Sequence, residues 1–118
     1  MNKREVGTCY EEQAAAYLQH RGMEVLWRNY RCYVGEIDLI LRDDDTLVFA
    51  EVKFRRTEDY GRGEFHVDRR KQRTIFRVAE QFLLRFFPDG NYPPCRFDVI
   101  AINGGGEVDH YPDAFWME

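Results

Sequence analysis

The stretch VGEIDLILRDDDTLVFAEVKFRR, residues 34–56, consists of two apolar runs joined by an acidic turn. Both runs are rich in Ile, Leu, Val and Phe, and their short polar connection predicts an antiparallel β-hairpin. Asp38 and Glu51 interrupt the apolar runs, although strands disfavour Asp and, less strongly, Glu. These two carboxylates therefore need a structural or a functional reason.

A turn centred on Asp44 and Asp45 pairs the strands so that Asp38 faces Glu51. Because side chains alternate between the two faces of a strand, one face is expected to be uniformly apolar: Ile37, Leu39, Leu41, Val48, Ala50, Val52 and Phe54. The opposite face is expected to carry Glu36, Asp38, Ile40, Phe49, Glu51, Lys53 and Arg55. The two apolar residues of that polar face predict that a helix covers part of it.

Two carboxylates at ~4 Å repel each other by ~4 kcal/mol at an effective dielectric constant of ~20. A hard cation offsets this repulsion, because Mg²⁺ binds through one or two carboxylates together with water and phosphate oxygens. It would also lower the pKa of a water, and Lys53 could stabilise the charge that develops when this water attacks a phosphate. The alternative is a solvated face on which Lys53 and Arg55 pair weakly with the two carboxylates.

The bulk composition bounds the class of protein. A chain of 118 residues is expected to form a single domain over 1–118. A composition of 44% hydrophobic and 32% charged residues excludes a disordered protein. No apolar run approaches the roughly 20 residues of a membrane span, and the N-terminus lacks a signal-peptide core, so a cytoplasmic location is expected. The scattered cysteines and histidines predict neither disulfides nor a zinc site.

The elements are expected in the order helix, three strands, helix, strand, which indicates an α/β fold with a mixed sheet. Periodicity and turn residues place them as a helix at 8–22 with Thr8 as N-cap, strands at 23–33, 35–41 and 47–54, a loop at 57–66, a helix from about Val67 to Phe87 and a strand at 95–102.

A basic segment stands out against the net charge of −4. Residues 53–77, which include Arg55, carry nine basic and four acidic side chains, so this segment could meet a polyanion. Cations in a first helical turn oppose the helix dipole, yet the second helix opens with DRRKQR. With the free N–H groups of a helix start, this cluster predicts phosphate contacts by Arg69, Arg70, Lys71 and Arg73. The alternative is a solvated helix end capped by Asp68.

An acid on one hairpin strand and ExK on the next, after a helix and a strand, resembles the PD-(D/E)xK nuclease superfamily. More closely, the chain is similar to the YraN-type family of uncharacterised bacterial proteins, which resemble Holliday-junction resolvases. The matching motifs are RNYRC, GEIDLI, VFAEVKFR, VDRRKQR, RFDVIAI and the terminal AF. The resemblance implies a restriction-endonuclease-like αβββαβ core, a mixed central sheet flanked by helices. Two residues depart from the pattern: Ile37 replaces the proline of the superfamily name, and Tyr10 replaces a usual glycine.

The resemblance also assigns roles to the hairpin residues. Asp38 and Glu51 would be metal ligands, the carbonyl of Val52 a further ligand, and Lys53 the catalytic lysine. Mg²⁺ is the implied cofactor, with Mn²⁺ as a substitute.

Residues of the two helices would complete the site. Glu11 would approach it from the first helix, as the helical acid does in resolvase-like members, whereas its alternative role is a capping box with Thr8. Lys71 and Gln72 match the helical position that supports the catalytic centre.

The function expected on this basis is that of a Mg²⁺-dependent DNA endonuclease. Branched or structured DNA as the substrate follows from analogy alone, and a junction cutter needs two active sites, which implies a homodimer. One alternative is a nucleic-acid-binding module of the same fold without turnover, and another is an interaction protein whose acidic surface docks a partner.

Two features towards the C-terminus have less clear roles. Asp98 could pair with Arg96 or Arg55, or orient Lys53, and a structural salt bridge is the favoured interpretation. The aromatic tail HYPDAFWME is expected to cover the core or an interface rather than to stack on bases, because nothing basic accompanies it. His66 and His110 receive no role.

Overall fold

The computed structural model describes residues 3–55 and 67–116. Its elements are α1 (Lys3–His20), β1 (Glu24–Cys32), β2 (Gly35–Asp43), β3 (Thr46–Arg55), α2 (Arg69–Phe86), β4 (Cys95–Asn103) and β5 (Val108–Tyr111). The described strands form one sheet in the order β1-β2-β3-β4-β5, in which β3 and β4 are parallel and all other neighbours antiparallel. The predicted αβββαβ order and the mixed sheet are therefore confirmed, and β5 is an addition that was not predicted.

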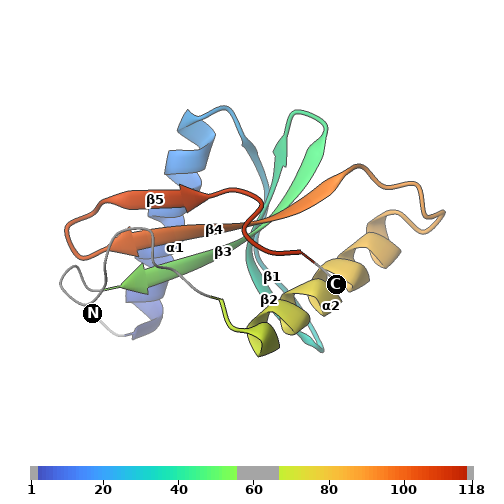
Figure 1. Cartoon of the computed structure of the whole chain (residues 1–118), viewed down its shortest axis with the longest axis horizontal. Coiled ribbons are helices and arrows are strands. Elements are labelled where there is room, and N and C mark those ends of the chain that lie inside the picture. The colour runs from blue at the N-terminus through green and yellow to red at the C-terminus, as the bar shows by residue number, and fades with distance from the viewer. Residues whose placement is uncertain (1–2, 56–66, 117–118) are drawn as a thin grey trace.

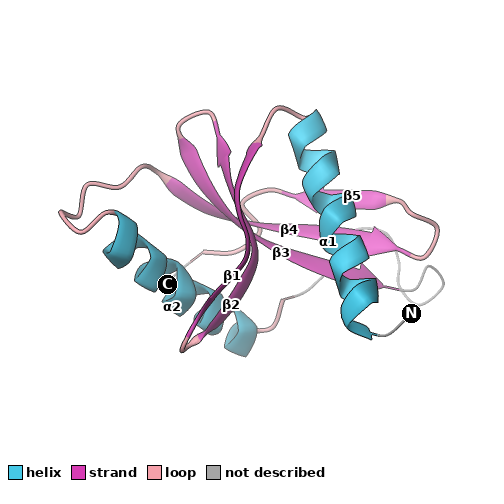
Figure 2. Cartoon of the chain, turned by 180° about the vertical axis from the view of Figure 1, so that it is seen from behind, coloured by secondary structure: helices cyan, strands magenta, loops and turns pink. Residues whose placement is uncertain are grey.

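The two helices lie on opposite faces of the twisted sheet, α2 in front and α1 behind it in Figure 1, and the reverse in Figure 2. On one face α1 packs through Ala14, Ala15 and Leu18 against the hairpin and β4. On the other face the apolar side of α2 covers Ile40 and Phe49, as predicted. Neither helix in the described part of the chain is both long and apolar enough to cross a membrane.

The predicted hairpin register is confirmed from the turn up to the pair Leu39–Ala50. Asp44 adopts φ 58 in the turn, a conformation that Asp tolerates. The prediction for Ile37 is wrong, because it packs in the cluster on the α2 side. Ile37 pairs with Tyr30 of β1, and the preceding residue of β1, Asn29, has φ 52 and is not among the residues paired with β2. Ile37 and Leu39, on either side of Asp38, therefore pack in different clusters, which breaks the expected alternation along β2.

The helix starts differ from those predicted. Because α1 begins at Lys3, Thr8 lies inside the helix and is not its N-cap. The preceding residues include the good helix formers Lys, Arg and Glu, which extend the helix by more than a turn. The second helix, α2, begins at Arg69 rather than at Val67, and Asp68 is its N-cap, as the alternative of a solvated helix end implied: its Oδ1 accepts a hydrogen bond of 2.8 Å from the backbone N–H of Lys71.

A close contact fixes α2 against β2. Gly35 has φ 154, and a Cβ at this position would lie 2.6 Å from Cγ2 of Thr74 and 3.3 Å from Cγ2 of Val78. Only glycine allows this approach of backbone and helix. The contact holds the first turns of α2 next to the polar part of the hairpin.

Candidate active site

Asp38 lies where β2 separates from β3. The regular ladder ends at Leu39–Ala50, two residues before Val52 on β3. The backbone N–H of Val52 instead donates a hydrogen bond of 2.8 Å to Oδ2 of Asp38. The aspartate side chain thus takes the place of a main-chain acceptor on β2. An aspartate in this apolar strand therefore has a local structural reason, and the separation of the strands turns its carboxyl towards β3.

Asp38 and Glu51 form a carboxyl pair. Glu51 is 5% exposed, and Asp38 is partly buried. The pKa of Asp38 is raised to about 8 by burial, by a hydrogen bond with the Glu51 carboxyl and by the negative charge of Glu51. The hydrogen bond from the Val52 N–H has the opposite, lowering effect on this pKa. Two carboxyl groups can share a hydrogen bond only when one of them carries a proton. In the absence of a cation, a proton therefore holds this pair together at neutral pH.

Two lysines approach the same carboxyl pair from the open side. Oε2 of Glu51 lies 4.0 Å from Nζ of Lys53 on β3 and 3.4 Å from Nζ of Lys71 on α2. The lysine side chains are 40% and 41% exposed. Among the described residues, no cation lies within ion-pair distance of Asp38. The lysines therefore balance the charge of Glu51 while they remain accessible from solvent.

The first helix contributes Glu11, as the resemblance implied. Burial raises the pKa of this half-buried side chain, and so do the charges of Asp38 and Glu36 and a hydrogen bond with Asp38, whereas a hydrogen bond with Asn29 lowers it. Because Thr8 is not an N-cap, the capping-box alternative for Glu11 is wrong. Asn29 was missed by the sequence reasoning. Its left-handed backbone, for which Asn is among the favoured residues, was not evident from RNYRC alone.

The oxygen atoms of this site fit a hard cation. In the described part of the chain, no three His, Cys, Asp or Glu side chains gather closely enough to bind a metal by themselves. Asp38 and Glu51 nevertheless supply two carboxylates, and Mg²⁺ needs only one or two besides water. The N–H and C=O of one strand residue point to the same side, so the Val52 carbonyl also faces β2. This set of donors resembles the ligand set predicted for Asp38, Glu51 and Val52.

The remaining predicted residues lie outside this cluster. Gln72 donates a hydrogen bond of 2.7 Å from Nε2 to the carbonyl of Val67, and so stabilises the start of α2. Arg55 ends β3, and its side chain lies outside the described part of the structure. Three predicted arginines are exposed on the first turns of α2: Arg69, Arg70 and Arg73. Of the basic cluster, only Lys71 therefore reaches Glu51.

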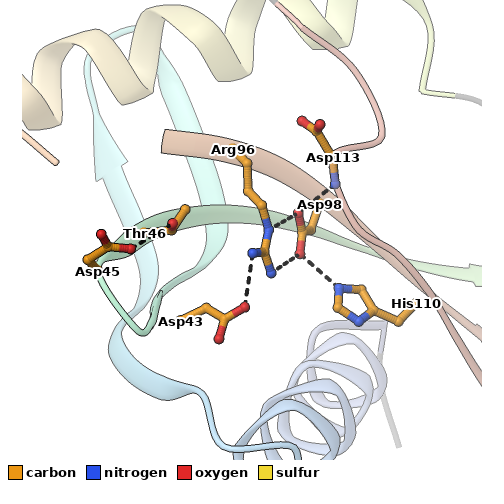
Figure 3. A network of polar contacts seen from close by, with 7 residues as sticks. All are labelled: Asp43, Asp45, Thr46, Arg96, Asp98, His110 and Asp113. Carbon is orange, nitrogen blue, oxygen red and sulfur yellow. Dashed lines mark hydrogen bonds and ion pairs between the residues drawn. The ribbon is translucent and has the colours of Figure 1, made fainter. Parts of the chain in front are cut away.

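A second polar network surrounds Asp98, which is 0% exposed (Figure 3). Its carboxylate accepts hydrogen bonds from Nε of Arg96 at 3.0 Å and from the backbone N–H of Asp113 at 2.9 Å, and it lies 2.8 Å from Nε2 of His110. Arg96 also binds Asp43 at 2.9 Å. The favoured interpretation, a structural salt bridge with Arg96, is confirmed, whereas His110 was missed.

The partners of Asp98 reverse the effect of its burial. Burial alone would raise the pKa of this carboxyl, but the hydrogen bonds from His110, Arg96 and the Asp113 backbone hold it below its usual value. Asp98 is therefore a charged group that the fold fully compensates. It fastens the C-terminal segment to β4 and takes no part in the Glu51 cluster.

The sequence also has clear relatives. Residues 10–102 match the family described as "Uncharacterised protein family UPF0102". The chain is 45% identical over 116 residues to a UPF0102 protein of Ralstonia nicotianae, covering 95% of this chain and 87% of the relative. It is 42% identical over 111 residues to one of Nitrosomonas europaea, covering 92% of both. A third, of Alcanivorax borkumensis, is 43% identical over 101 residues, with coverage of 86% and 80%. The chain therefore belongs to the UPF0102 family, the YraN-type family that the sequence motifs predicted.

Proposed function

We propose that this protein is a metal-dependent DNA endonuclease of the PD-(D/E)xK superfamily that hydrolyses phosphodiester bonds. The observation that carries the proposal is the carboxyl pair of Asp38 and Glu51, in which the pKa of Asp38 is raised and Glu51 has two lysines on its open side. Carboxyl groups with a strongly perturbed pKa and specific charged partners are concentrated at functional sites. A purely structural carboxyl would be expected to have a cation beside it, and Asp38 has none among the described residues.

Asp38, Glu51 and the carbonyl of Val52 would hold the metal, Mg²⁺ or Mn²⁺ in its place. When bound, such an ion neutralises the developing charge on a phosphate and lowers the pKa of a water molecule. Asp38 would release its proton as the cation enters, since metal ligands bind in their deprotonated form. The repulsion between the two carboxylates is then offset by the ion, and the pair stays together.

The lysines and Glu11 would have separate roles. Lys53 can move from Glu51 towards an incoming phosphate because its side chain is half exposed, and there it would stabilise the charge of the transition state. Lys71, the closer of the two to Glu51, balances and positions this carboxylate. Glu11 holds the Asp38 carboxyl from the side of α1 through their hydrogen bond.

DNA would reach the site along the exposed start of α2. Arg69, Arg70 and Arg73 lie within a turn of Lys71, where they can contact the phosphate backbone. A preference for branched or structured DNA is part of the proposal through the resemblance to resolvases. Such a substrate would be cut by a homodimer with one site in each chain.

The test is a cleavage assay with the purified protein on labelled four-way-junction, flap, linear duplex and single-stranded DNA. Each substrate is incubated with Mg²⁺, Mn²⁺ or EDTA. We expect cleavage that needs the metal and falls to background in Glu51→Gln. The matched control is Glu24→Gln, which removes an exposed carboxylate that pairs with Arg42. If no substrate is cut while DNA binding is intact and independent of both metal and Glu51→Gln, the protein is a binding module instead.

A further inference from the structure

A groove separates the exposed side of α2 from the C-terminal segment. Its volume is about 860 Å³, within the range of sites that hold organic ligands. Three arginines at four-residue spacing line its wall on α2, and aromatic side chains line the other wall. The residues that matter below are Arg69, Arg73, Arg77, Phe115 and Trp116.

This groove is distinct from the Glu51 cluster. In an α-helix each residue is rotated by about 100° from the last, so residues four apart share a face, whereas those two apart point to nearly opposite sides. Lys71 is two residues from both Arg69 and Arg73. Lys71 therefore faces Glu51, while the row of arginines faces the C-terminal segment.

The row of arginines matches a chain of negative charges. Its three members span about 12 Å along the helix, given a rise of about 1.5 Å per residue. Arg73 and Arg77 are exposed, and no acidic side chain of the described residues forms an ion pair with either. Guanidinium groups bind phosphates through paired N–H donors. The wall on α2 therefore suits a phosphate backbone.

The opposite wall presents a large aromatic ring that is held in place. Trp116 is 67% exposed, and its Nε1 donates a hydrogen bond of 2.6 Å to Oδ1 of Asp113. The backbone N–H of Asp113 is in turn bound to the buried Asp98 (Figure 3). The indole is thus both accessible and oriented by the core. The expectation that nothing basic accompanies the C-terminal aromatic residues is wrong, because folding brings the arginines of α2 beside them.

We infer that this groove binds single-stranded nucleic acid, with the arginines on its phosphates and a base stacked on Trp116. Cationic grooves that carry aromatic platforms are the usual means of holding single strands, because every base has a π-face. An acidic peptide could also use the arginines but would leave the indole without a partner. The groove shares Arg69 and Arg73 with the DNA path proposed above and adds a stacking site to it, and the inference holds whether or not the chain cuts DNA.

Binding of a fluorescein-labelled 20-nucleotide oligothymidine in EDTA tests the inference without any cleavage. Anisotropy gives the affinity, and tryptophan fluorescence reports stacking. We expect the oligonucleotide to quench the wild-type emission and Trp116→Phe to abolish that quenching. The only other tryptophan, Trp27, packs between Phe82 and Phe86 outside the groove and serves as an internal control.

Substitutions separate the contributions of the Trp116 ring and of the arginine charges to binding. Trp116→Ala is expected to weaken binding at least about fivefold, the lower end for loss of one stacked base. Arg73→Gln combined with Arg77→Gln is expected to reduce the slope of log affinity against log salt by about 1.4. Arg85→Gln, an exposed arginine at the other end of α2, is the matched control and should change neither the stacking signal nor the affinity by more than twofold.

Three results would overturn the inference. The first is an unchanged affinity in Trp116→Ala, or no quenching in the wild type. The second is an equal loss for duplex and single-stranded DNA in that variant, since paired bases cannot stack on the indole. The third is tighter binding of a polyglutamate peptide than of the oligonucleotide through the same arginines, which would assign the groove to an acidic protein partner.

Discussion

Two aspartates of the same sheet, Asp38 and Asp98, are both shielded from solvent, but the groups that surround them differ in charge. Asp98 is fully buried and accepts hydrogen bonds from a guanidinium, an imidazole and a backbone N–H, and its pKa is lowered. Asp38 has a second carboxyl group as its main partner, and its pKa is raised to about 8. Burial penalises the charged form of both groups. Their partners therefore decide whether each carboxylate stabilises the fold or is held at a cost.

The comparison separates a carboxyl that the described residues satisfy from one that they leave without a cation. The charge of Asp98 is satisfied within the chain, by residues that tie β4 to the C-terminal segment. The charge of Asp38 has no such partner in the described residues, and a raised pKa is the consequence. A fold that retains a group under these conditions is expected to use it.

The largest effect on stability is expected at Asp98. Asp98→Ala leaves the Arg96 guanidinium partly buried without its main partner and releases the backbone of Asp113, so the free energy of unfolding should fall by about 3–5 kcal/mol. Urea unfolding measures this change. The control Asp43→Ala removes only the outer, more exposed partner of Arg96 and should cost less than about 1 kcal/mol. Equal losses in the two variants would contradict the structural role of Asp98.

A gain in stability is expected at Asp38. Because its pKa is higher in the folded chain than its usual value near 4, stability falls as the pH rises from about 4 through about 8. Asp38→Asn mimics the protonated form, so its gain in the free energy of unfolding should be larger at pH 8.5 than at pH 5, by about 1.4 kcal/mol for each pH unit between 5 and the raised pKa. The pH dependence that Asp98 causes has the opposite sign, since its contribution to the free energy of unfolding is lost as the pH falls below about 4. Urea unfolding of Asp38→Asn without metal at both pH values checks the prediction, and an equal gain at both would refute it.

The smallest effect on stability, but not on activity, is expected at Lys71. This ammonium group is 41% exposed, so its interaction with Glu51 is screened, and Lys71→Met should change the free energy of unfolding by less than about 1 kcal/mol. If Lys71 positions Glu51 for catalysis, the cleavage rate should fall about tenfold or more. Arg85→Met on the last turn of α2 should leave that rate unchanged. A stability loss comparable to that of Asp98→Ala would make Lys71 a structural residue.

The sequence was informative wherever local periodicity determines structure. The alternation of apolar residues and the acidic turn predicted the hairpin register, and the N-cap Asp68 was recognised from the residues that open α2. The resemblance predicted that Glu11 and Lys71, from two different helices, approach the carboxyl pair. These predictions depend on neighbours in sequence or on a motif that the chain retains.

What the sequence could not predict depends on contacts between distant segments. The left-handed backbone of Asn29 and the placement of Ile37 on the face opposite the one predicted both belong to the pairing of β1 with β2. His110 joins Asp98 only because β5 pairs with β4. The meeting of Trp116 with the arginines of α2 is equally a product of folding, because the intervening chain gives no sign that the two segments share a groove.

The most direct test of the central claim is a calorimetric titration with Mn²⁺ or Mg²⁺ at pH 7 in two buffers of different ionisation enthalpy. The difference between the buffers gives the number of protons released per cation bound. Because the pKa of Asp38 lies above this pH, we predict release of most of one proton in the wild type and none from this site in Asp38→Asn, which should also bind more weakly. Absence of binding in the wild type, or binding without proton release, would contradict the claim that a cation replaces the proton between Asp38 and Glu51.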